Sequence, residues 1–493
     1  MKSKEITVAK TTEMKDGDTK KIEIDEKEIL ISRIDGKFYA VGGSCPHYGA
    51  SLAEGVLCGD QIYCPWHHAS FNAKTGELEN PPSRDSLPEF ELKIEDENVV
   101  LIVPEKIEKS RVPDMAKKDP QADDRTFVVL GGGAAGNMAA QTLREDGFQG
   151  RIVMVTKENR LPYDRPNLSK PYMRGEAEAE WLPLRSEDFY QKHDIEVLLQ
   201  HKVTNVDRSG KTIIFENGDT LKYDKLLLAT GGVPRTLDVP GADLKNIFIL
   251  RSWDDADDII SAAEKAKSVA VIGASFIGTE VAFSLSKRNL PVTVIAPESV
   301  VFELVLGEKI GSMFQNLHKQ NGVDLNLGSK IEKFVGNGRV QSVVLQNDEH
   351  IDADLVIIGI GVKPATDFLS EFDLQSDGSL LVDEYFRVDE DVYAAGDIAT
   401  FRDFRTSENI RVEHWRVAEQ QGRHAAHNMA GKRVKYKNIP FFWTSQVDLH
   451  FRYVGYAEKW DEIIFDGDPD SQQFLAFYVK DDKVHAAAGV GRD

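Results

Sequence analysis

Residues 131–136, Gly-Gly-Gly-Ala-Ala-Gly, constrain the fold of this chain more than any other segment. A short apolar run, residues 127–130, precedes them, and apolar residues at helical spacing follow. A strand, a glycine-rich turn and a helix in this order are typical of a dinucleotide-binding fold. Gly131 permits the tight turn, Gly133 lets the backbone approach a pyrophosphate, and Gly136 lets helix and strand pack closely. We therefore predict that Gly131, Gly133, Ala135 and Gly136 contact a dinucleotide; a glycine-rich turn without a ligand is the alternative.

A second copy of this pattern lies at residues 269–278. The apolar run 269–272 leads into a turn with Ser275 in place of the middle glycine, and the predicted nucleotide contacts are Gly273, Phe276, Ile277 and Gly278. Two such units in one chain favour a flavin site together with a nicotinamide site. The next apolar run ends at Ala296, where an acidic residue normally binds the NAD ribose, so this segment does not distinguish NADH from NADPH.

Cysteine and histidine pairs mark the first hundred residues. Cys45-Pro46-His47 and Cys64-Pro65-Trp66-His67 are separated by 16 residues. C-x-H followed by C-x-x-H is the ligand pattern of a Rieske 2Fe–2S cluster, in which two thiolates hold one iron and two imidazoles hold the other. A four-ligand zinc site uses the same residue types and is the alternative. The third cysteine, Cys58, is predicted to be a small buried apolar residue.

Charged residues after the first glycine-rich turn complete the predicted flavin site. Glu158 follows the strand predicted at residues 151–155, where an acid binds the adenosine ribose. Arg165 and Lys170 lie in the proline-rich loop 161–170 and can face the pyrophosphate and the flavin ring.

Segments far along the chain return to the same site. Ala229, Thr230 and Gly231 end a predicted strand with small residues that let a loop pass close to a cofactor, and Gly361 lies in a similar returning segment. Asp397 ends another predicted strand and is suited to accept a hydrogen bond from ribityl hydroxyls. Trp415 begins a helix whose N-terminal end can stabilise a reduced, anionic flavin.

Taken together, residues 125–493 resemble the ferredoxin-reductase branch of the two-dinucleotide-fold flavoproteins, which includes apoptosis-inducing factor. With its Rieske motif the whole chain is similar to the apoptosis-inducing-factor-like proteins that fuse both units. The resemblance implies that FAD is bound at six positions: Glu158, Arg165, Lys170, Arg235, Asp397 and Trp415. It also implies a catalytic pair, Lys170 and Glu280, beside the isoalloxazine.

The fold expected from these motifs is multidomain. It has an all-β Rieske domain, two Rossmann-like α/β dinucleotide-binding domains and a small α+β C-terminal domain. The predicted boundaries are 1–103 for the Rieske domain, 104–124 for a linker, 125–247 and 376–435 for the FAD domain, 248–375 for the NAD(P) domain, and 436–493 for the C-terminal domain.

We therefore expect an enzyme in which NADH or NADPH reduces FAD, and FAD reduces the fused 2Fe–2S cluster, which passes electrons to an unknown acceptor. A redox-sensing or apoptosis-inducing-factor-like signalling protein is the alternative. A Rieske oxygenase would need a mononuclear iron, for which the candidate ligands are His414, Glu419, His424 and His427.

Composition limits the remaining classes. A net charge of −21 argues against a nucleic-acid partner, because binding phosphates requires clustered Lys and Arg. We see neither a signal peptide nor an apolar run of the ~18 residues needed to span a membrane. Three cysteines do not form a disulfide framework. We therefore expect a cytoplasmic protein, with a homodimer as one possible state.

Overall fold

The computed structural model describes residues 3–492. The chain divides into two compact units: residues 1–119 with 141–149, and residues 120–140 with 150–493. Each unit has its own buried core, and each is described by itself below.

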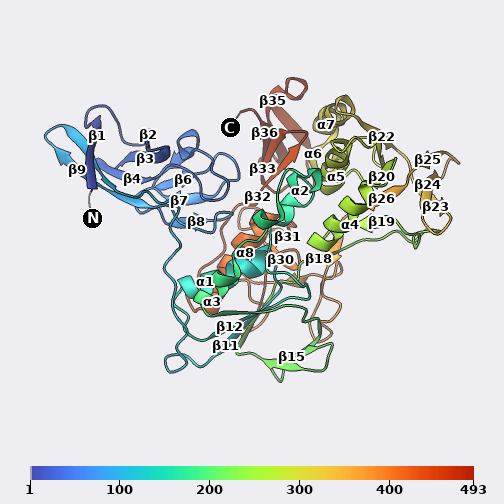
Figure 1. The fold of residues 1–493 in the computed structure, drawn as a ribbon, viewed down its shortest axis with the longest axis horizontal. Helices are drawn as coiled ribbons and strands as arrows, with labels where there is room; N and C mark the ends of the chain where they lie inside the picture. The colour runs from blue at the N-terminus through green and yellow to red at the C-terminus, as the bar shows by residue number, and fades with distance from the viewer. Residues whose placement is uncertain (1–2, 493) are drawn as a thin grey trace. The chain divides into compact units, whose positions relative to one another are not determined.

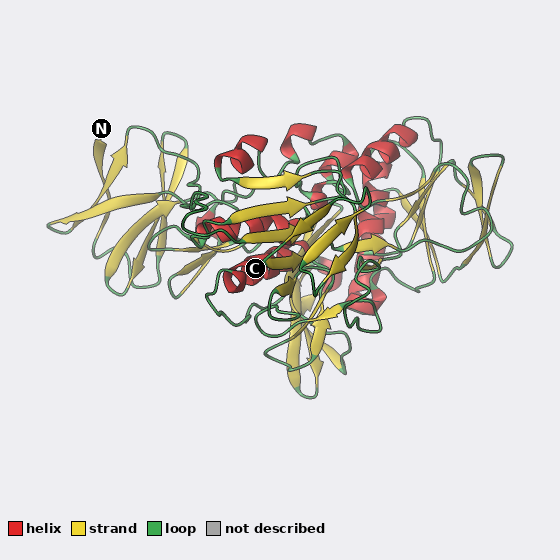
Figure 2. Cartoon of the chain, turned by 90° about the horizontal axis from the view of Figure 1, so that it is seen from below, coloured by secondary structure: helices red, strands yellow, loops and turns green. Residues whose placement is uncertain are grey.

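The first unit contains two antiparallel sheets, drawn in blue in Figure 1 and as yellow strands near the N-terminus in Figure 2. The larger sheet has, in spatial order, β1 (Ser3–Lys10), β10 (Asn98–Pro104), β9 (Glu89–Glu95), β4 (Lys37–Gly42), β3 (Lys27–Ile34) and β2 (Thr19–Ile24). The smaller sheet has β5 (Val56–Cys58), β6 (Gln61–Tyr63), β7 (Ser70–Asn72) and β8 (Leu78–Asn80). A 3₁₀ turn, η1 (Leu52–Glu54), precedes β5.

Strand β3 contributes side chains to two hydrophobic core clusters. Leu30 packs in one buried cluster, while Ile29 and Ile31 pack in another. Successive side chains of a strand point to opposite faces, so one strand can close both cores. The first of these clusters also holds Cys45 and Cys64, so the two predicted thiolate ligands are part of a packed core.

A parallel sheet organises the first dinucleotide-binding part of the second unit. Its order is β13 (Ile195–Leu198), β12 (Arg151–Val155), β11 (Thr126–Leu130), β17 (Lys225–Leu228) and β29 (Val392–Ala394). The central strand β11 is buried on both faces, as its unbroken apolar run predicts. Helix α1 (Ala134–Glu145) follows β11 directly after the glycine-rich turn.

A second parallel sheet repeats this arrangement. Its order is β19 (Ile247–Ile249), β26 (Leu355–Ile358), β20 (Val269–Ile272), β21 (Val292–Ala296) and β22 (Val323–Leu327). The remaining helices of the two dinucleotide-binding parts are α2 (Pro171–Arg174), α3 (Glu187–Lys192), α4 (Trp253–Ala263), α5 (Phe276–Ser286), α6 (Glu303–Leu306), α7 (Glu308–Gln320) and α8 (Trp415–Met429), with 3₁₀ turns η2 (Arg165–Asn167) and η3 (Ala179–Trp181).

Short antiparallel sheets connect the main elements. Their strands are β14 (Val203–Asp207), β15 (Thr212–Phe215) and β16 (Thr220–Lys222); β18 (Gly232–Pro234) with β27 (Val362–Pro364); β23 (Ile331–Gly336), β24 (Val340–Leu345) and β25 (His350–Asp352); and β30 (Ala399–Arg402) with β31 (Asn409–Arg411). Strand β28 (Leu380–Leu381) pairs with β30 in parallel.

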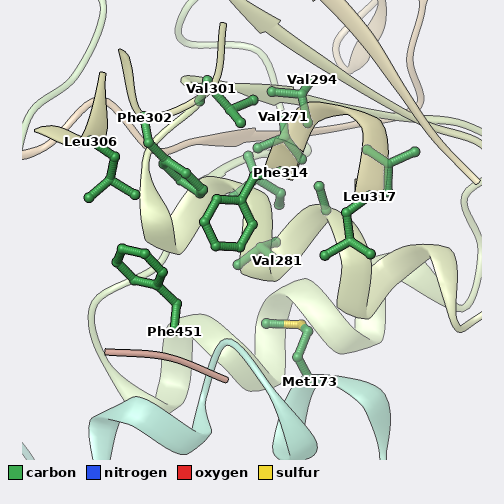
Figure 3. Close-up of a cluster of buried hydrophobic side chains, with 14 of the residues drawn as sticks. Met173, Val271, Val281, Val294, Val301, Phe302, Leu306, Phe314, Leu317 and Phe451 are labelled. Carbon is green, nitrogen blue, oxygen red and sulfur yellow. The ribbon is translucent and has the colours of Figure 1, made fainter. Parts of the chain in front are cut away.

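The C-terminal part is an antiparallel sheet. Its order is β32 (Phe441–Gln446), β33 (Leu449–Gly455), β36 (Lys483–Val490), β35 (Gln473–Lys480) and β34 (Glu462–Asp468), with the 3₁₀ turn η4 (Pro469–Ser471). Figure 3 shows how it packs: Phe451 of β33 lies next to Phe314 of α7. The centroids of the Phe314 and Phe451 rings are 5.5 Å apart, so this sheet shares a core with the second dinucleotide-binding part.

Across residues 3–492 we find no helix with the length and apolar character that a membrane crossing requires.

Candidate functional site

Two loops of the first unit carry the predicted iron ligands, and both loops have the same backbone pattern. The Cys45 amide donates to the Ala50 carbonyl at 2.8 Å, and the Gly49 amide donates to the Cys45 carbonyl at 2.8 Å. In the second loop the Cys64 amide donates to the Ala69 carbonyl at 2.8 Å, and the His68 amide returns to the Cys64 carbonyl at 3.2 Å. The repeated pattern closes each ligand loop into a tight turn that contains the histidine following the cysteine.

The ligand side chains form a thiol pair and an imidazole pair. The Nδ1 atoms of His47 and His67 are 3.1 Å apart, and two nitrogens bound to one metal ion at about 2.1 Å would lie about 3.0–3.4 Å apart. Burial, together with His67, lowers the pKa of His47 well below its ordinary value, which favours the neutral, ligating form. The Cys64 thiol, together with burial, raises the pKa of Cys45, so thiolates here need the positive charge that iron supplies.

The donor set fits a two-iron cluster, because the thiol pair and the imidazole pair can each hold one iron. Among the described residues, we find no group of three or more His, Cys, Asp and Glu side chains arranged to hold a single metal ion.

The prediction that Cys58 is buried was wrong. Cys58 ends β5 and is exposed, because the burial of this three-residue strand alternates and only Leu57, its middle residue, is partly covered. A cysteine therefore behaves here as an edge residue of a small sheet and not as a core residue.

One cavity of about 750 Å³ lies in the second unit and brings together most of the other predicted site residues. The predicted residues that line it are Gly131, Gly133, Ala135, Glu158, Arg165, Lys170, Ala229, Thr230, Gly231, Phe276, Ile277, Gly278, Glu280, Gly361, Asp397 and Trp415. Three predicted residues, Gly136, Gly273 and Arg235, are not among the lining residues. Both glycine-rich turns thus open onto the same cavity.

The glycines of the first turn have different surroundings. Gly131 has φ +131°, and a Cβ there would lie 2.1 Å from the Ala229 carbonyl oxygen. A Cβ on Gly136 would lie 1.9 Å from the Gly131 carbonyl oxygen, so Gly136 lets α1 pack on β11 and does not face the cavity. A Cβ on Gly133 would meet no atom within 4 Å. The space beside Gly133 is open, which is what a close approach of the backbone to a pyrophosphate requires.

Glu158 is held by two partners at the end of β12. The Arg165 guanidinium lies 2.5 Å from its carboxylate, and the Tyr163 hydroxyl donates to it at 2.5 Å. Burial alone would raise the pKa of Glu158, but these two partners hold it below the ordinary value. The carboxylate is therefore ionised and lines the cavity, where it can accept hydrogen bonds from ribose hydroxyls.

Lys170 and Glu280 form an ion pair at the cavity wall. The Lys170 Nζ atom lies 2.7 Å from Glu280 Oε2, and the side chains are 17% and 5% exposed. Lys170 also donates to the Pro166 carbonyl at 3.1 Å. The pair joins the loop before α2 to the first turns of α5 and so connects the two dinucleotide-binding parts.

Sequence reasoning missed Arg251. The Arg251 guanidinium lies 3.0 Å from the Asp397 carboxylate, and both residues line the cavity. The predicted residue Arg235 does not line it; its guanidinium donates to the Val362 carbonyl at 3.2 Å. Arg251 immediately precedes Ser252, which caps α4 with a capping box. Its position before a helix cap is a weak signal, because such a residue more often contacts solvent than a ligand.

The contacts of Ser275 explain why the second turn has a serine in place of the middle glycine. The Ser275 hydroxyl accepts from the Gly278 amide at 3.2 Å and donates to the Gly359 carbonyl at 2.9 Å. Serine therefore caps α5 and joins it to the segment after β26, where glycine would do neither. Ala296 is buried at the end of β21, so no carboxylate stands at the usual ribose position.

Comparison with known proteins assigns three segments of the chain to known families. Family models match as Rieske [2Fe-2S] domain over residues 4–91, pyridine nucleotide-disulphide oxidoreductase over residues 125–422, and reductase C-terminal over residues 441–493. The chain belongs to the pyridine nucleotide-disulphide oxidoreductase family.

Two relatives and one solved structure illustrate what this chain is similar to. Apoptosis-inducing factor 3 of Homo sapiens is 37% identical over 99% of this chain and 82% of its own length. Putidaredoxin reductase of Pseudomonas putida is 33% identical over 74% of this chain and 88% of its own length. The crystal structure of the covalent putidaredoxin reductase–putidaredoxin complex matches with a TM-score of 0.71 and 33% identity, over 75% of this chain and 90% of that one.

This oxidoreductase is therefore an NAD(P)H-dependent flavoprotein of the ferredoxin reductase type, with FAD and a Rieske 2Fe–2S cluster as cofactors. The predicted family and multidomain fold class are confirmed, and the C-terminal domain is β-rich. The roles of the individual site residues stay predictions.

Proposed function

We propose that this oxidoreductase takes electrons from NADH or NADPH onto FAD, passes them to its own Rieske cluster, and delivers them to an acceptor outside the chain. The observation that carries the proposal is the single cavity onto which both glycine-rich turns open, in a chain that also contains the paired cysteines and histidines. When bound, flavin supplies the conversion of a two-electron hydride into single electrons.

The residues of the chain would supply position and charge. We propose that Gly131 and Gly133 approach the pyrophosphate, Glu158 binds the adenosine ribose, and Arg165 offsets phosphate charge. Asp397 and Arg251 would orient the ribityl chain. The N-terminus of α8, at Trp415, would place its partial positive charge beside the flavin ring.

The Lys170–Glu280 pair would lie beside the flavin ring as the catalytic pair. Lysine offers positive charge where a hydride arrives, and Glu280 keeps that charge in place. We also propose residues 104–124 as the linker between the predicted domains, because a covalent connection raises the effective concentration of the cluster near the flavin.

Anaerobic titration with NADH and then NADPH tests the proposal. Visible absorbance follows the flavin, and low-temperature electron paramagnetic resonance follows the cluster. We expect the flavin band to bleach and a Rieske-type signal to appear, with the better nucleotide acting at lower concentration. Bleaching without that signal in a cluster-loaded sample would overturn the internal path from flavin to cluster.

One comparison favours a second function, redox signalling. A relative that matches over 99% of this chain is named an apoptosis-inducing factor. Slow turnover with every diffusible acceptor, together with nicotinamide-dependent formation of a homodimer, would favour signalling. Fast turnover with a ferredoxin-like or small-molecule acceptor, without a change of oligomeric state, would favour the reductase.

A further inference from the structure

The Glu280 carboxylate has more partners than the lysine alone. The Ser169 hydroxyl donates to Oε2 at 2.6 Å, and the Thr444 hydroxyl donates to Oε1 at 2.7 Å. Thr444 lies on β32 of the C-terminal sheet, so a third part of the chain reaches the catalytic pair. Glu280, Ser169 and Thr444 are all buried.

Behind Thr444 the polar contacts continue into the core. The Gln446 side-chain amide donates to the Thr444 hydroxyl at 2.9 Å and to the Phe276 carbonyl at 3.3 Å. A carbonyl can only accept, and this fixes the orientation of the amide. The Gln446 Oε1 atom then lies 3.0 Å from His318 Nε2 on α7.

These contacts run in one direction. Since Gln446 Oε1 only accepts, His318 must carry its proton on Nε2. His318 therefore donates to Gln446, Gln446 donates to Thr444, and Thr444 donates to Glu280. Every donor points toward the carboxylate. His318 and Gln446 are 0% exposed, and His318 Nδ1 has no hydrogen-bond partner among the described atoms.

We infer that Thr444, Gln446 and His318 are positioning residues that hold the Glu280 carboxylate against Lys170 and offset part of its negative charge. A chain of hydrogen bonds with aligned dipoles is stronger in a buried setting than separate bonds would be. The inference rests on the proposed function in one respect, because it places the Lys170–Glu280 pair beside the flavin.

The expected consequence is a change in flavin potential. Without the Thr444 donor, more of the Glu280 charge would act on Lys170 and on the space beside it. Electron-rich, reduced flavin would then be less stable relative to oxidised flavin. Thr444→Val removes the hydroxyl at nearly constant shape, whereas Thr444→Ser keeps it and serves as the matched control.

The experiment measures the midpoint potential of the flavin in the full-length holoprotein with a chemical reductant and mediators. For Thr444→Val we expect the oxidised-to-reduced equilibrium to shift about tenfold toward oxidised flavin, which is about 30 mV for two electrons. Thr444→Ser should shift it less than about twofold. Equal potentials in Thr444→Val and the wild type, with FAD fully bound, would overturn the inference.

Gln446→Leu tests the next link. It should lower the potential in the same direction but by less, because Thr444 still donates to Glu280. A shift as large as that of Thr444→Val would still support the chain, whereas no shift would limit the positioning role to Thr444 and overturn it for Gln446 and His318.

A measurement on the wild-type protein tests the inference even if the Thr444 and Gln446 variants do not fold. Nitrogen-15 NMR of labelled histidine should show His318 protonated at Nε2, with its signal assigned by comparison with His318→Phe. Protonation at Nδ1 would reverse the chain and overturn the inference. Because no nicotinamide is used, a failure of NADH or NADPH to reduce the cluster would count against the proposed function alone.

Discussion

Burial of single histidines makes the stability of the second unit depend on pH. His318, His414 and His424 each have a pKa lowered by burial to about 4. Each imidazole is therefore neutral in the folded protein near pH 6. The unfolded chain takes up protons below about pH 6.5, so the free energy of unfolding decreases as pH falls from about 6.5 to about 4.

For His318 the linkage predicts a loss of about 3 kcal/mol in the free energy of unfolding between pH 6.5 and pH 4. His318→Phe should be less stable near pH 7, because Gln446 loses its donor, but its stability should fall less steeply with pH. Denaturant unfolding of the holoprotein at several pH values measures both effects, and His450→Phe, at an exposed position, is the control. Parallel pH profiles for the wild type and His318→Phe would contradict the prediction.

Individual residues show how far sequence alone can reach. The spacing of Cys45, His47, Cys64 and His67 predicts the cluster, because the cysteine and histidine of each loop are close in the chain. Arg251, Thr444 and Gln446 could not be found in this way. Thr444 meets Glu280 across 164 residues, and Gln446 meets His318 across 128 residues, so only the packed fold brings them together.

Two helices, α1 and α8, meet the cavity at their N-terminal ends, and glycine controls how closely they approach each other. A Cβ on Gly422 of α8 would lie 2.0 Å from the Ala135 carbonyl oxygen of α1. That atom belongs to backbone, so the helices would have to move apart. Gly133, just before α1, would meet no protein atom at all.

These glycines therefore make a matched pair. Gly422→Ala should lower the free energy of unfolding by about 1–3 kcal/mol, because it overpacks a helix contact, with or without FAD. Gly133→Ala should leave the FAD-free protein within about 1 kcal/mol of the wild type but weaken FAD binding, because its methyl group fills this open space. Thermal unfolding with and without FAD, and FAD titration, separate the two. FAD affinity equal to the wild type in Gly133→Ala would contradict a phosphate at this turn.

Elements differed in how well their sequence predicted them. The apolar runs before the glycine-rich turns form β11 and β20, and the predicted strand at residues 151–155 is β12. The C-terminal part was expected to be α+β, and the described residues 436–492 contain only the turn η4 besides strands. Strand β35 alternates between partly exposed and buried positions along much of its length, a period of two that indicates strand and not helix.

At the scale of the whole molecule, each unit contains hydrophobic core clusters of its own. The core clusters around Leu30 and Ile29 lie in the first unit, and those around Phe314 and Val343 lie in the second. We therefore expect that loss of the iron–sulfur cluster leaves the flavin-binding unit folded. One substitution in the first unit can then test the route of the electrons.

Cys64→Ser removes a predicted cluster ligand, and Cys58→Ser changes the exposed third cysteine as its matched control. In Cys64→Ser we expect the Rieske signal to disappear while FAD stays bound and NADH or NADPH still reduces it at the wild-type rate. Electron delivery to a ferredoxin-like protein acceptor should be lost, because the cluster is the proposed exit. Cys58→Ser should keep both the signal and the delivery. If Cys64→Ser delivers electrons as fast as the wild type, flavin reduces the acceptor directly and the cluster lies off the route.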